Sequence, residues 1–160
     1  QNQTVTYYSD GEYQQDALSE IDNMLMDPSS QEVRTISKDL LDFLYEVKEI
    51  AKTRLGREPE IHVISGYRSP STNNHLKENS PFKDGIARKS QHTLGNAIDF
   101  FIPGLSDEQL RDIAWCLQKG GIGYYPEYAD MTGYEYIHID SGKVRFWGGN
   151  FNFHNIDCGP

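Results

Sequence analysis

The sequence has no long apolar run and few basic residues, and each scarcity excludes a class of protein. No stretch approaches the roughly 20 consecutive apolar residues of a membrane-spanning helix, so no membrane span is expected. Lysine and arginine together number 15 against 24 acidic residues, which gives a formal net charge of −9. Nucleic acid is a polyanion, and it is therefore not expected as a partner.

Cysteine is also scarce, since Cys116 and Cys158 are the only two. Cys116 lies in a helical pattern and Cys158 lies two residues from the C-terminal end, so a disulfide and two separate thiols both stay open. Internal repeats and low-complexity segments are absent from the sequence. A chain of 160 residues is long enough for one domain, residues 1–160, with its own hydrophobic core.

Helical periodicity is clearest between Ser37 and Gly56. The apolar residues that recur there at steps of three and four are Leu40, Leu41, Leu44, Val47, Ile50, Ala51 and Leu55. Ser37 is placed as the N-cap of this helix, and Gly56 is placed to end it. A shorter pattern over residues 17–25 and a capping box at residues 106–109 predict two further helices.

Short strands are predicted where β-branched and aromatic residues gather. The predicted strands are residues 4–8 at an edge, 61–65 as a buried strand, 97–102, 122–125, 136–140 and 144–147. Residues 141–143 predict a hairpin turn between the last two strands. The polar segment 71–89 is predicted to be a long loop with at most one helical turn. Together these elements predict an α+β fold, a small, mostly antiparallel sheet with helices packed on one face.

Two histidines and one acid stand out against these strands. Asp99 alternates with apolar residues in the strand predicted at 97–102, so it faces away from the core and must meet water, a cation or a hydrogen-bond donor. His92 precedes Asp99 by seven residues, and His138 has a similar position in the strand at 136–140. A lone histidine is more often structural than a metal ligand. Two imidazoles and a carboxylate, however, are the ligand set of a catalytic zinc ion with one open coordination position.

The residues around this set resemble the zinc D-alanyl-D-alanine peptidases, which cleave peptides of the bacterial cell wall. The family pattern is met at Ser90, His92, Gly95, Ala97 and Asp99. Three further segments, residues 65–70, 120–126 and 138–147, resemble landmarks of the YcbK-like branch of murein endopeptidases and occur in the same order. The resemblance covers residues 6–147.

This resemblance implies a Hedgehog/D-Ala-D-Ala peptidase-like fold in which His92, Asp99 and His138 hold zinc. It implies hydrolysis of peptide bonds in peptidoglycan stem peptides or cross-bridges by a periplasmic or secreted enzyme, which we expect to be a monomer. A murein cross-link endopeptidase is the favoured form. A D-Ala-D-Ala-type carboxypeptidase or dipeptidase is one alternative, and a catalytically silent cell-wall-binding domain on the same fold is another.

Glu135 and Asp140 are the two acids close to His138 that could act as the general base. The resemblance favours Glu135, because an acid three residues before the last histidine ligand is the usual base in the wider family. A regular strand would place Glu135 and His138 on opposite faces, so the strand must begin or bulge between them. Asp140 shares the face of His138, and it is either the base or a partner that orients the imidazole.

Arg68 follows the strand predicted at 61–65 and lies in a glycine- and proline-containing turn. As an ordinary turn residue it would form a surface ion pair worth under about 1 kcal/mol. The resemblance implies instead that its guanidinium binds a substrate carboxylate or supports an oxyanion. Tyr125 and Trp147 are candidates for a groove wall that stacks on the substrate, although most aromatic side chains belong to the core.

Overall fold

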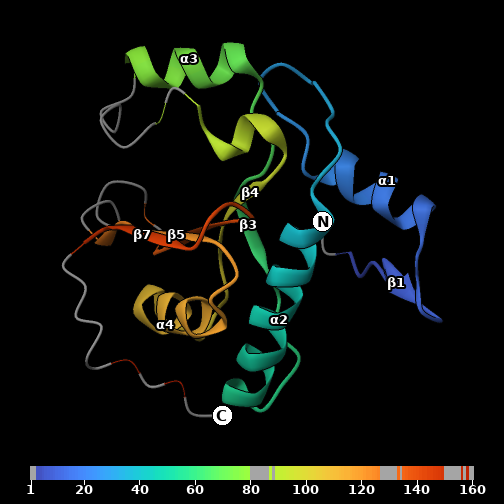
Figure 1. Ribbon diagram of the computed structural model, residues 1–160, viewed down its shortest axis with the longest axis vertical. Coiled ribbons are helices and arrows are strands. Elements are labelled where there is room, and N and C mark those ends of the chain that lie inside the picture. The colour runs from blue at the N-terminus through green and yellow to red at the C-terminus, as the bar shows by residue number, and fades with distance from the viewer. Residues whose placement is uncertain are drawn as a thin grey trace. The chain divides into compact units, whose positions relative to one another are not determined.

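The computed structural model describes residues 3–79, 87, 89–126, 133, 135–149, 156 and 158 (Figure 1). The chain divides into two compact units. The first unit consists of residues 1–36 and 66–95, and the second consists of residues 37–65 and 96–160. Within the described ranges, no helix combines the length and the apolar character that crossing a bilayer requires.

Among its described residues, the first unit contains a short hairpin and three helical segments. β1 (Tyr8–Ser9) pairs antiparallel with β2 (Glu12–Tyr13), and α1 covers Gln15–Met24. The other two segments are α3 (Pro70–Asn79) and the short 3-10 helix η2 (Gln91–Leu94). The edge strand predicted at residues 4–8 is wrong in its extent, because pairing begins only at Tyr8.

The predicted loop at residues 71–89 is wrong over its first half, where α3 forms ten residues of helix. Helical periodicity did not predict α3, because Asn73 is its one described buried residue and the helix lacks an apolar stripe. Pro70 occupies the first helical position, where its missing N–H does no harm. The Ser69 hydroxyl accepts a hydrogen bond from the Thr72 backbone N–H at 3.2 Å. Residues 80–86 and 88 of the predicted loop lie outside the described residues.

The second unit contains a five-stranded sheet with the order β3-β4-β6-β5-β7. The strands are β3 (His62–Ser65), β4 (Ala97–Phe101), β5 (Gly121–Tyr124), β6 (Ile137–Asp140) and β7 (Arg145–Gly148). Each pairing in this sheet is antiparallel except the parallel pairing of β5 with β7. The predicted α+β fold with a small, mostly antiparallel sheet is confirmed.

Two predictions about the sheet are wrong in detail. β6 and β7 do not form a hairpin, because β4 and β5 occupy both edges of β6 and β7 pairs with the outer edge of β5. β3 is not a buried strand, since it lies at the sheet edge with Val63 44% and Ile64 43% exposed. β-branched composition predicted these strands, but it did not predict their positions in the sheet.

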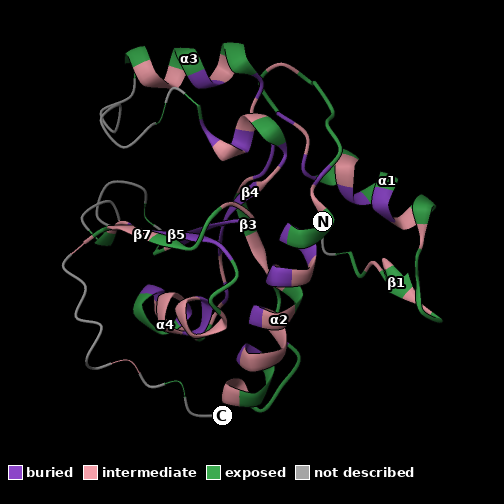
Figure 2. Cartoon of the chain, in the orientation of Figure 1, coloured by how far each residue is buried: buried purple, intermediate pink, exposed green. Residues whose placement is uncertain are grey.

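Helices α2 (Lys38–Leu55) and α4 (Asp107–Leu117) contact each other and the sheet. The capping box predicted for α4 is present, and Gly56 ends α2 in a left-handed conformation as predicted. Figure 2 shows buried residues along both helices and on β4. The fully buried apolar side chains of the strands include Ile98, Phe100, Ile122, Ile137 and Ile139. These side chains alternate with Asp99 and His138, so the two helices cover the apolar face of the sheet.

Cys116 of α4 and Cys158 form a disulfide, with their Cα atoms 5.5 Å apart. The sequence left open whether these cysteines form a disulfide or stay as two separate thiols, and the structure contains the disulfide.

Candidate metal centre

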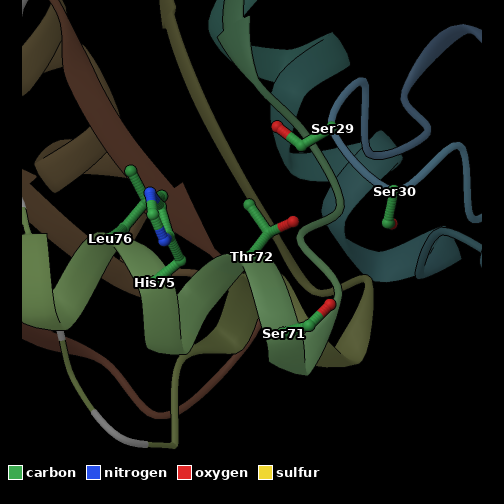
Figure 3. Close-up of a pocket in the computed structure, with 6 residues that line it drawn as sticks. All are labelled: Ser29, Ser30, Ser71, Thr72, His75 and Leu76. Atoms are coloured by element: carbon green, nitrogen blue, oxygen red, sulfur yellow. The ribbon is translucent and has the colours of Figure 1, made fainter.

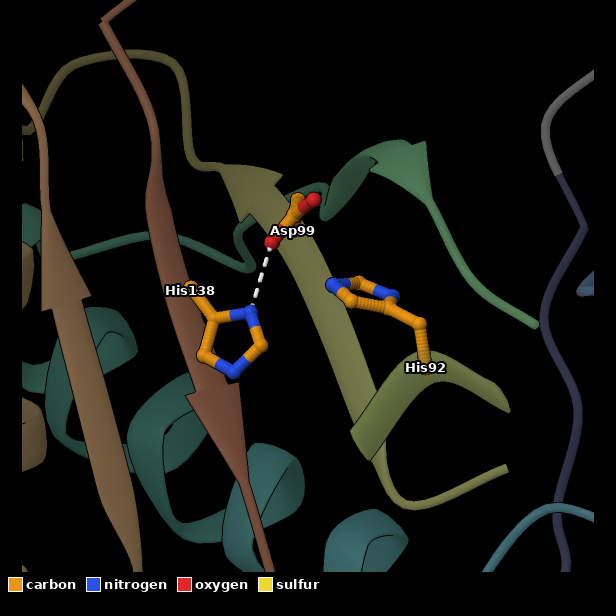
Figure 4. Close-up of side chains that lie close together, drawn as sticks. All are labelled: His92, Asp99 and His138. Carbon is orange, nitrogen blue, oxygen red and sulfur yellow. Dashed lines mark hydrogen bonds and ion pairs between the residues drawn. The ribbon is translucent and has the colours of Figure 1, made fainter. Parts of the chain in front are cut away.

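The structure brings together the three side chains that the sequence proposed as zinc ligands. One nitrogen of His92, one nitrogen of His138 and one carboxylate oxygen of Asp99 all lie within 4.8 Å of one another. All three residues are buried. Figure 4 shows the two imidazole rings on either side of the Asp99 carboxylate.

Strand pairing explains how Asp99 and His138 meet. β4 and β6 are antiparallel neighbours, and their register places Asp99 directly opposite His138. Directly opposed side chains on one face of a sheet have Cβ atoms about 5 Å apart. Each residue is only 6% exposed, so the carboxylate and the imidazole are desolvated and need polar partners.

His92 is held by its own short helix and by a backbone carbonyl. Ser90 precedes η2, and its hydroxyl accepts a hydrogen bond from the His92 backbone N–H at 3.3 Å. Nδ1 of His92 lies 2.7 Å from the carbonyl oxygen of Gly66. Because a carbonyl oxygen only accepts, Nδ1 carries the proton, and Nε2 keeps the lone pair that a metal ion needs.

Both ring nitrogens of His138 face carboxylates. Nδ1 lies 2.9 Å from Oδ1 of Asp99, and Nε2 lies 3.0 Å from Oδ2 of Asp140. Burial lowers the pKa of His138, but the hydrogen bonds to Asp140 and Asp99 outweigh it and raise the pKa overall. A metal cation bound to both Nδ1 of His138 and the Asp99 carboxylate can replace the proton between these two groups. The Nε2–H of His138 then still donates to Asp140. The donor set therefore fits a divalent metal ion.

Asp140 is fully buried, and donors already surround its carboxylate. Arg145 donates to Oδ1 at 2.9 Å and to Oδ2 at 2.6 Å, and the Gly142 N–H donates to Oδ1 at 2.8 Å. Burial raises the pKa of Asp140, but its hydrogen bonds with His138 and Arg145 bring that pKa well below the usual range. Asp140 is thus an anion whose oxygens are in use, which suits it to orienting His138.

Glu135 is exposed and lies just before β6, which begins at Ile137. The strand start that the sequence required between Glu135 and His138 is therefore present. The negative charge of Glu135 also affects the pKa of Asp107, which occupies the first position of α4. Burial raises the pKa of Asp107, and the negative charges of Glu135 and Glu108 raise it further. Glu135 is thus a solvent-accessible acid in an acidic neighbourhood.

Arg68 is half-buried in a turn whose backbone is fixed on both sides. Its own N–H donates to the carbonyl oxygen of His92 at 3.2 Å. The next N–H, of Ser69, donates to Oδ2 of Asp27 at 2.8 Å. Tyr67 donates its N–H to the carbonyl oxygen of Leu25 at 2.8 Å. The backbone on both sides of Arg68 is consequently held in place by its neighbours.

Asp27 is a buried residue that our reading of the sequence missed. It is fully buried and accepts hydrogen bonds from the backbone N–H groups of Ser29 and Ser69 and from the Ser30 hydroxyl. Burial raises its pKa, but the hydrogen bonds from Thr72, Ser69 and Ser29 bring it well below the usual range. The succession Asp-Pro-Ser-Ser, which favours a turn stabilised by the Asp side chain, was the available signal.

The first unit also contains a pocket of about 270 Å³ (Figure 3). It is lined by Ser29, Ser30, Ser71, Thr72, His75 and Leu76. None of the three candidate metal ligands is among these residues. Several of the hydroxyls already have partners within the unit, since Ser30 bonds Asp27 at 3.0 Å and Ser71 lies 2.9 Å from the Ser69 hydroxyl. The pocket is therefore separate from the metal ligands and has no evident role in the chemistry.

Comparison with known proteins gave matches over most of the chain. A family model described as Peptidoglycan L,D-endopeptidase MepK matches residues 1–147. The Peptidoglycan L,D-endopeptidase MepK of Escherichia coli (strain K12) is 36% identical over 135 residues, which cover 84% of this chain and 67% of the relative. The Probable peptidoglycan L,D-endopeptidase MepK of Haemophilus influenzae is 37% identical over 133 residues, which cover 82% and 64%.

Among solved structures, a vancomycin resistance D,D-pentapeptidase VanY from a VanB-type cassette, in complex with Zn(II), matches with a TM-score of 0.43 and 18% identity. The match covers 67% of this chain and 73% of that chain.

Proposed function

We propose, from the premise that this chain belongs to the peptidoglycan L,D-endopeptidase family, that it hydrolyses L,D peptide cross-links in peptidoglycan with zinc held by His92, Asp99 and His138. The predicted family and the predicted class of enzyme, a zinc metallopeptidase acting on peptidoglycan, are confirmed. The convergence of two imidazoles and one carboxylate within 4.8 Å carries the ligand assignment. The names of the relatives favour an endopeptidase over a carboxypeptidase or a silent domain.

The hydrogen bonds of the two imidazoles support this ligand set. His92 offers Nε2, because its Nδ1–H donates to Gly66. His138 offers Nδ1, because its Nε2 is bonded to Asp140. Such second partners fix the tautomer and the orientation of a ligand histidine. When bound, zinc supplies Lewis-acid chemistry for peptide hydrolysis.

The remaining roles follow from exposure and from existing partners. Glu135, which is exposed, is the general base that takes the proton of the attacking water and passes it to the leaving amine. Asp140, which is buried against Arg145, orients His138 instead. Arg68, fixed by its turn, binds a carboxylate of the stem peptide or stabilises the developing oxyanion, for which a planar guanidinium is suited.

We further propose that residues 1–160 work as a single zinc peptidase-like domain, as a monomer, in the periplasm or outside the cell. The family model spans 147 residues, which supports one functional domain. The disulfide between Cys116 and Cys158 supports the location, since disulfides form and persist in oxidising compartments.

Digestion of intact sacculi by the zinc-loaded protein tests the activity. Chromatography with mass analysis should show L,D-linked muropeptide dimers converted to monomers, with glycan strands uncut. Asp99→Ala and His138→Ala proteins are matched controls and should neither retain zinc nor digest the sacculi. Loss of terminal D-alanine alone would instead identify a carboxypeptidase, and unchanged sacculi would exclude the peptidase assignment. Full zinc occupancy in the Asp99→Ala protein would remove Asp99 from the ligand set.

A further inference from the structure

β5 carries glycine at both of its positions that face the same side of the sheet as His138. The register places each glycine directly between one residue of β6 and one of β7: Gly121 between Asp140 and Arg145, and Gly123 between His138 and Trp147. Because side chains alternate along a strand, residues 121 and 123 lie on one face. β5, which lies between β6 and β7, therefore leaves two adjacent spaces above its glycines that side chains of β7 can enter.

The first space is crossed by Arg145. A Cβ atom at residue 121 would lie 2.7 Å from Cζ of Arg145 and 2.5 Å from Oδ2 of Asp140, closer than real Cβ contacts come. Through this space the guanidinium makes a two-point contact with Asp140, at 2.9 and 2.6 Å. Oδ2 of Asp140 in turn lies 3.0 Å from Nε2 of His138. Arg145 thus reaches the histidine through one intermediate residue.

The second space is occupied by Trp147. A Cβ atom at residue 123 would lie 2.9 Å from the indole atoms Cε2 and Cζ2, and 2.8 Å from the Tyr125 hydroxyl. The indole N–H donates to that hydroxyl at 2.7 Å. The indole meets the His138 ring edge to face, with centroids 5.1 Å apart, and Cζ of Arg145 lies 4.7 Å from the indole centroid. Trp147 is therefore held in contact with His138 by bonds and packing on several sides.

We propose that Arg145 and Trp147 of β7 are positioning residues for the metal ligand His138, and that Gly121 and Gly123 are required because they let these side chains cross β5. Arg145 acts through Asp140 by keeping that carboxylate aligned as the acceptor for Nε2–H. Trp147 acts directly by limiting rotation of the imidazole. The inference rests on the proposed function, since it takes His138 as a zinc ligand.

Three measurements on the full chain test this. They are zinc affinity by competition with a chelator, the visible spectrum of the Co²⁺-substituted protein, and kcat at saturating zinc. Gly121→Ala and Gly123→Ala should each weaken zinc affinity about 10- to 100-fold, as loss of an outer partner of a metal ligand does, and should alter the Co²⁺ spectrum. Ile122→Val is the matched control, because Ile122 is buried on the opposite face of the same strand and its change should lower thermal stability only.

Double variants show whether the glycines act through β7. If Gly123→Ala works by displacing the indole, then Gly123→Ala/Trp147→Ala should bind zinc no more weakly than Trp147→Ala alone. The same relation should hold for Gly121→Ala with Arg145→Ala. Arg145→Lys, a change at a side chain that is 41% exposed, keeps the charge but loses the two-point contact. It should still weaken zinc affinity even if a glycine variant does not fold.

Several results would overturn the inference. These are additive effects in the double variants, or folded Arg145→Lys and glycine variants with unchanged zinc affinity and Co²⁺ spectrum. His138→Ala separates this failure from that of the proposed function. If His138→Ala retains wild-type zinc affinity, the ligand assignment itself is wrong. If it loses zinc while the β7 and glycine variants keep it, only the positioning role is wrong.

Discussion

The two acids near His138 differ in what their oxygens already bind. Asp140 is fully buried and accepts hydrogen bonds from Arg145, Gly142 and His138. Glu135 is exposed and lies just before β6. A general base needs an unoccupied lone pair and access to the substrate water. At the scale of single residues, this difference supports the roles that we propose for them.

Glu135→Gln should preserve the fold and the bound zinc while lowering kcat by ~10²–10⁴-fold, because an amide does not accept the proton of water. Asp140→Asn should instead weaken zinc affinity by ~10–100-fold, since it disturbs the partner of His138. Steady-state kinetics at saturating zinc, with metal analysis of both variants, separates these effects. Near-normal turnover in Glu135→Gln, together with zinc-bound but inactive Asp140→Asn, would make Asp140 the base.

Arg68→Ala should leave zinc content unchanged and lower kcat/KM, because the guanidinium is proposed to bind the substrate and not the metal. Arg57→Ala is a suitable control, since Arg57 is an exposed arginine bonded to the carbonyl oxygen of Pro103. Both proteins are assayed on the same purified muropeptide dimer. Equal activity of the two variants would assign Arg68 a structural role in its turn.

At the scale of elements, the sequence predicted most features that depend on neighbouring residues alone, such as helix caps, helix ends and the alternation of side chains in a strand. The capping box at Ser106, the end of α2 at Gly56 and the alternation around Asp99 are properties of a few neighbouring residues, and all are present. The pairing of β7 with β5 and the exposure of β3 were not predictable in this way, because both depend on which strand edges remain available. α3 was missed because its stability comes from caps and polar contacts.

The role of Gly121 and Gly123 was not predictable from the sequence either. Only the strand order shows that side chains of β7 lie over these two glycines. The candidate ligands, by contrast, were recognisable from their residue types and spacing, although their assignment as ligands is still a prediction. Asp27 shows the opposite case, in which the sequence analysis did not single out a buried acid although a turn signal lies beside it.

Asp27 should stabilise the first unit in a pH-dependent way. Its pKa in the folded protein lies below the ordinary value of 3.8, so its contribution is fully present above that value. The contribution is lost as the pH falls toward the folded-state pKa. Asp27→Asn should therefore cost about 2 kcal/mol of stability at pH 7, as loss of hydrogen bonds to a charged group does.

Thermal melts of the metal-free wild-type and Asp27→Asn proteins between pH 7 and pH 2 measure this dependence. Using metal-free protein removes the separate effect of acid on zinc binding. The difference in Tm between the two proteins should shrink progressively below about pH 4. A difference that stays constant across this range would show that the carboxylate charge does not stabilise the turn.

At the scale of the whole molecule, one covalent bond joins α4 to the C-terminal segment. Cys116 and Cys158 are separated by 42 residues in the sequence. A cross-link of this span lowers the conformational entropy of the unfolded chain. Such a disulfide usually stabilises the folded state by about 2–4 kcal/mol. Replacing both cysteines by serine should therefore lower the Tm, and a reducing agent should lower the wild-type Tm to a similar extent.

The double variant is its own control, since a reductant should leave its Tm unchanged. If the reduced wild-type protein melted at the same temperature as the oxidised protein, the bridge would not contribute to folding stability. Zinc content and muropeptide turnover should be unchanged in the double variant, because neither cysteine is among the proposed ligands or catalytic residues.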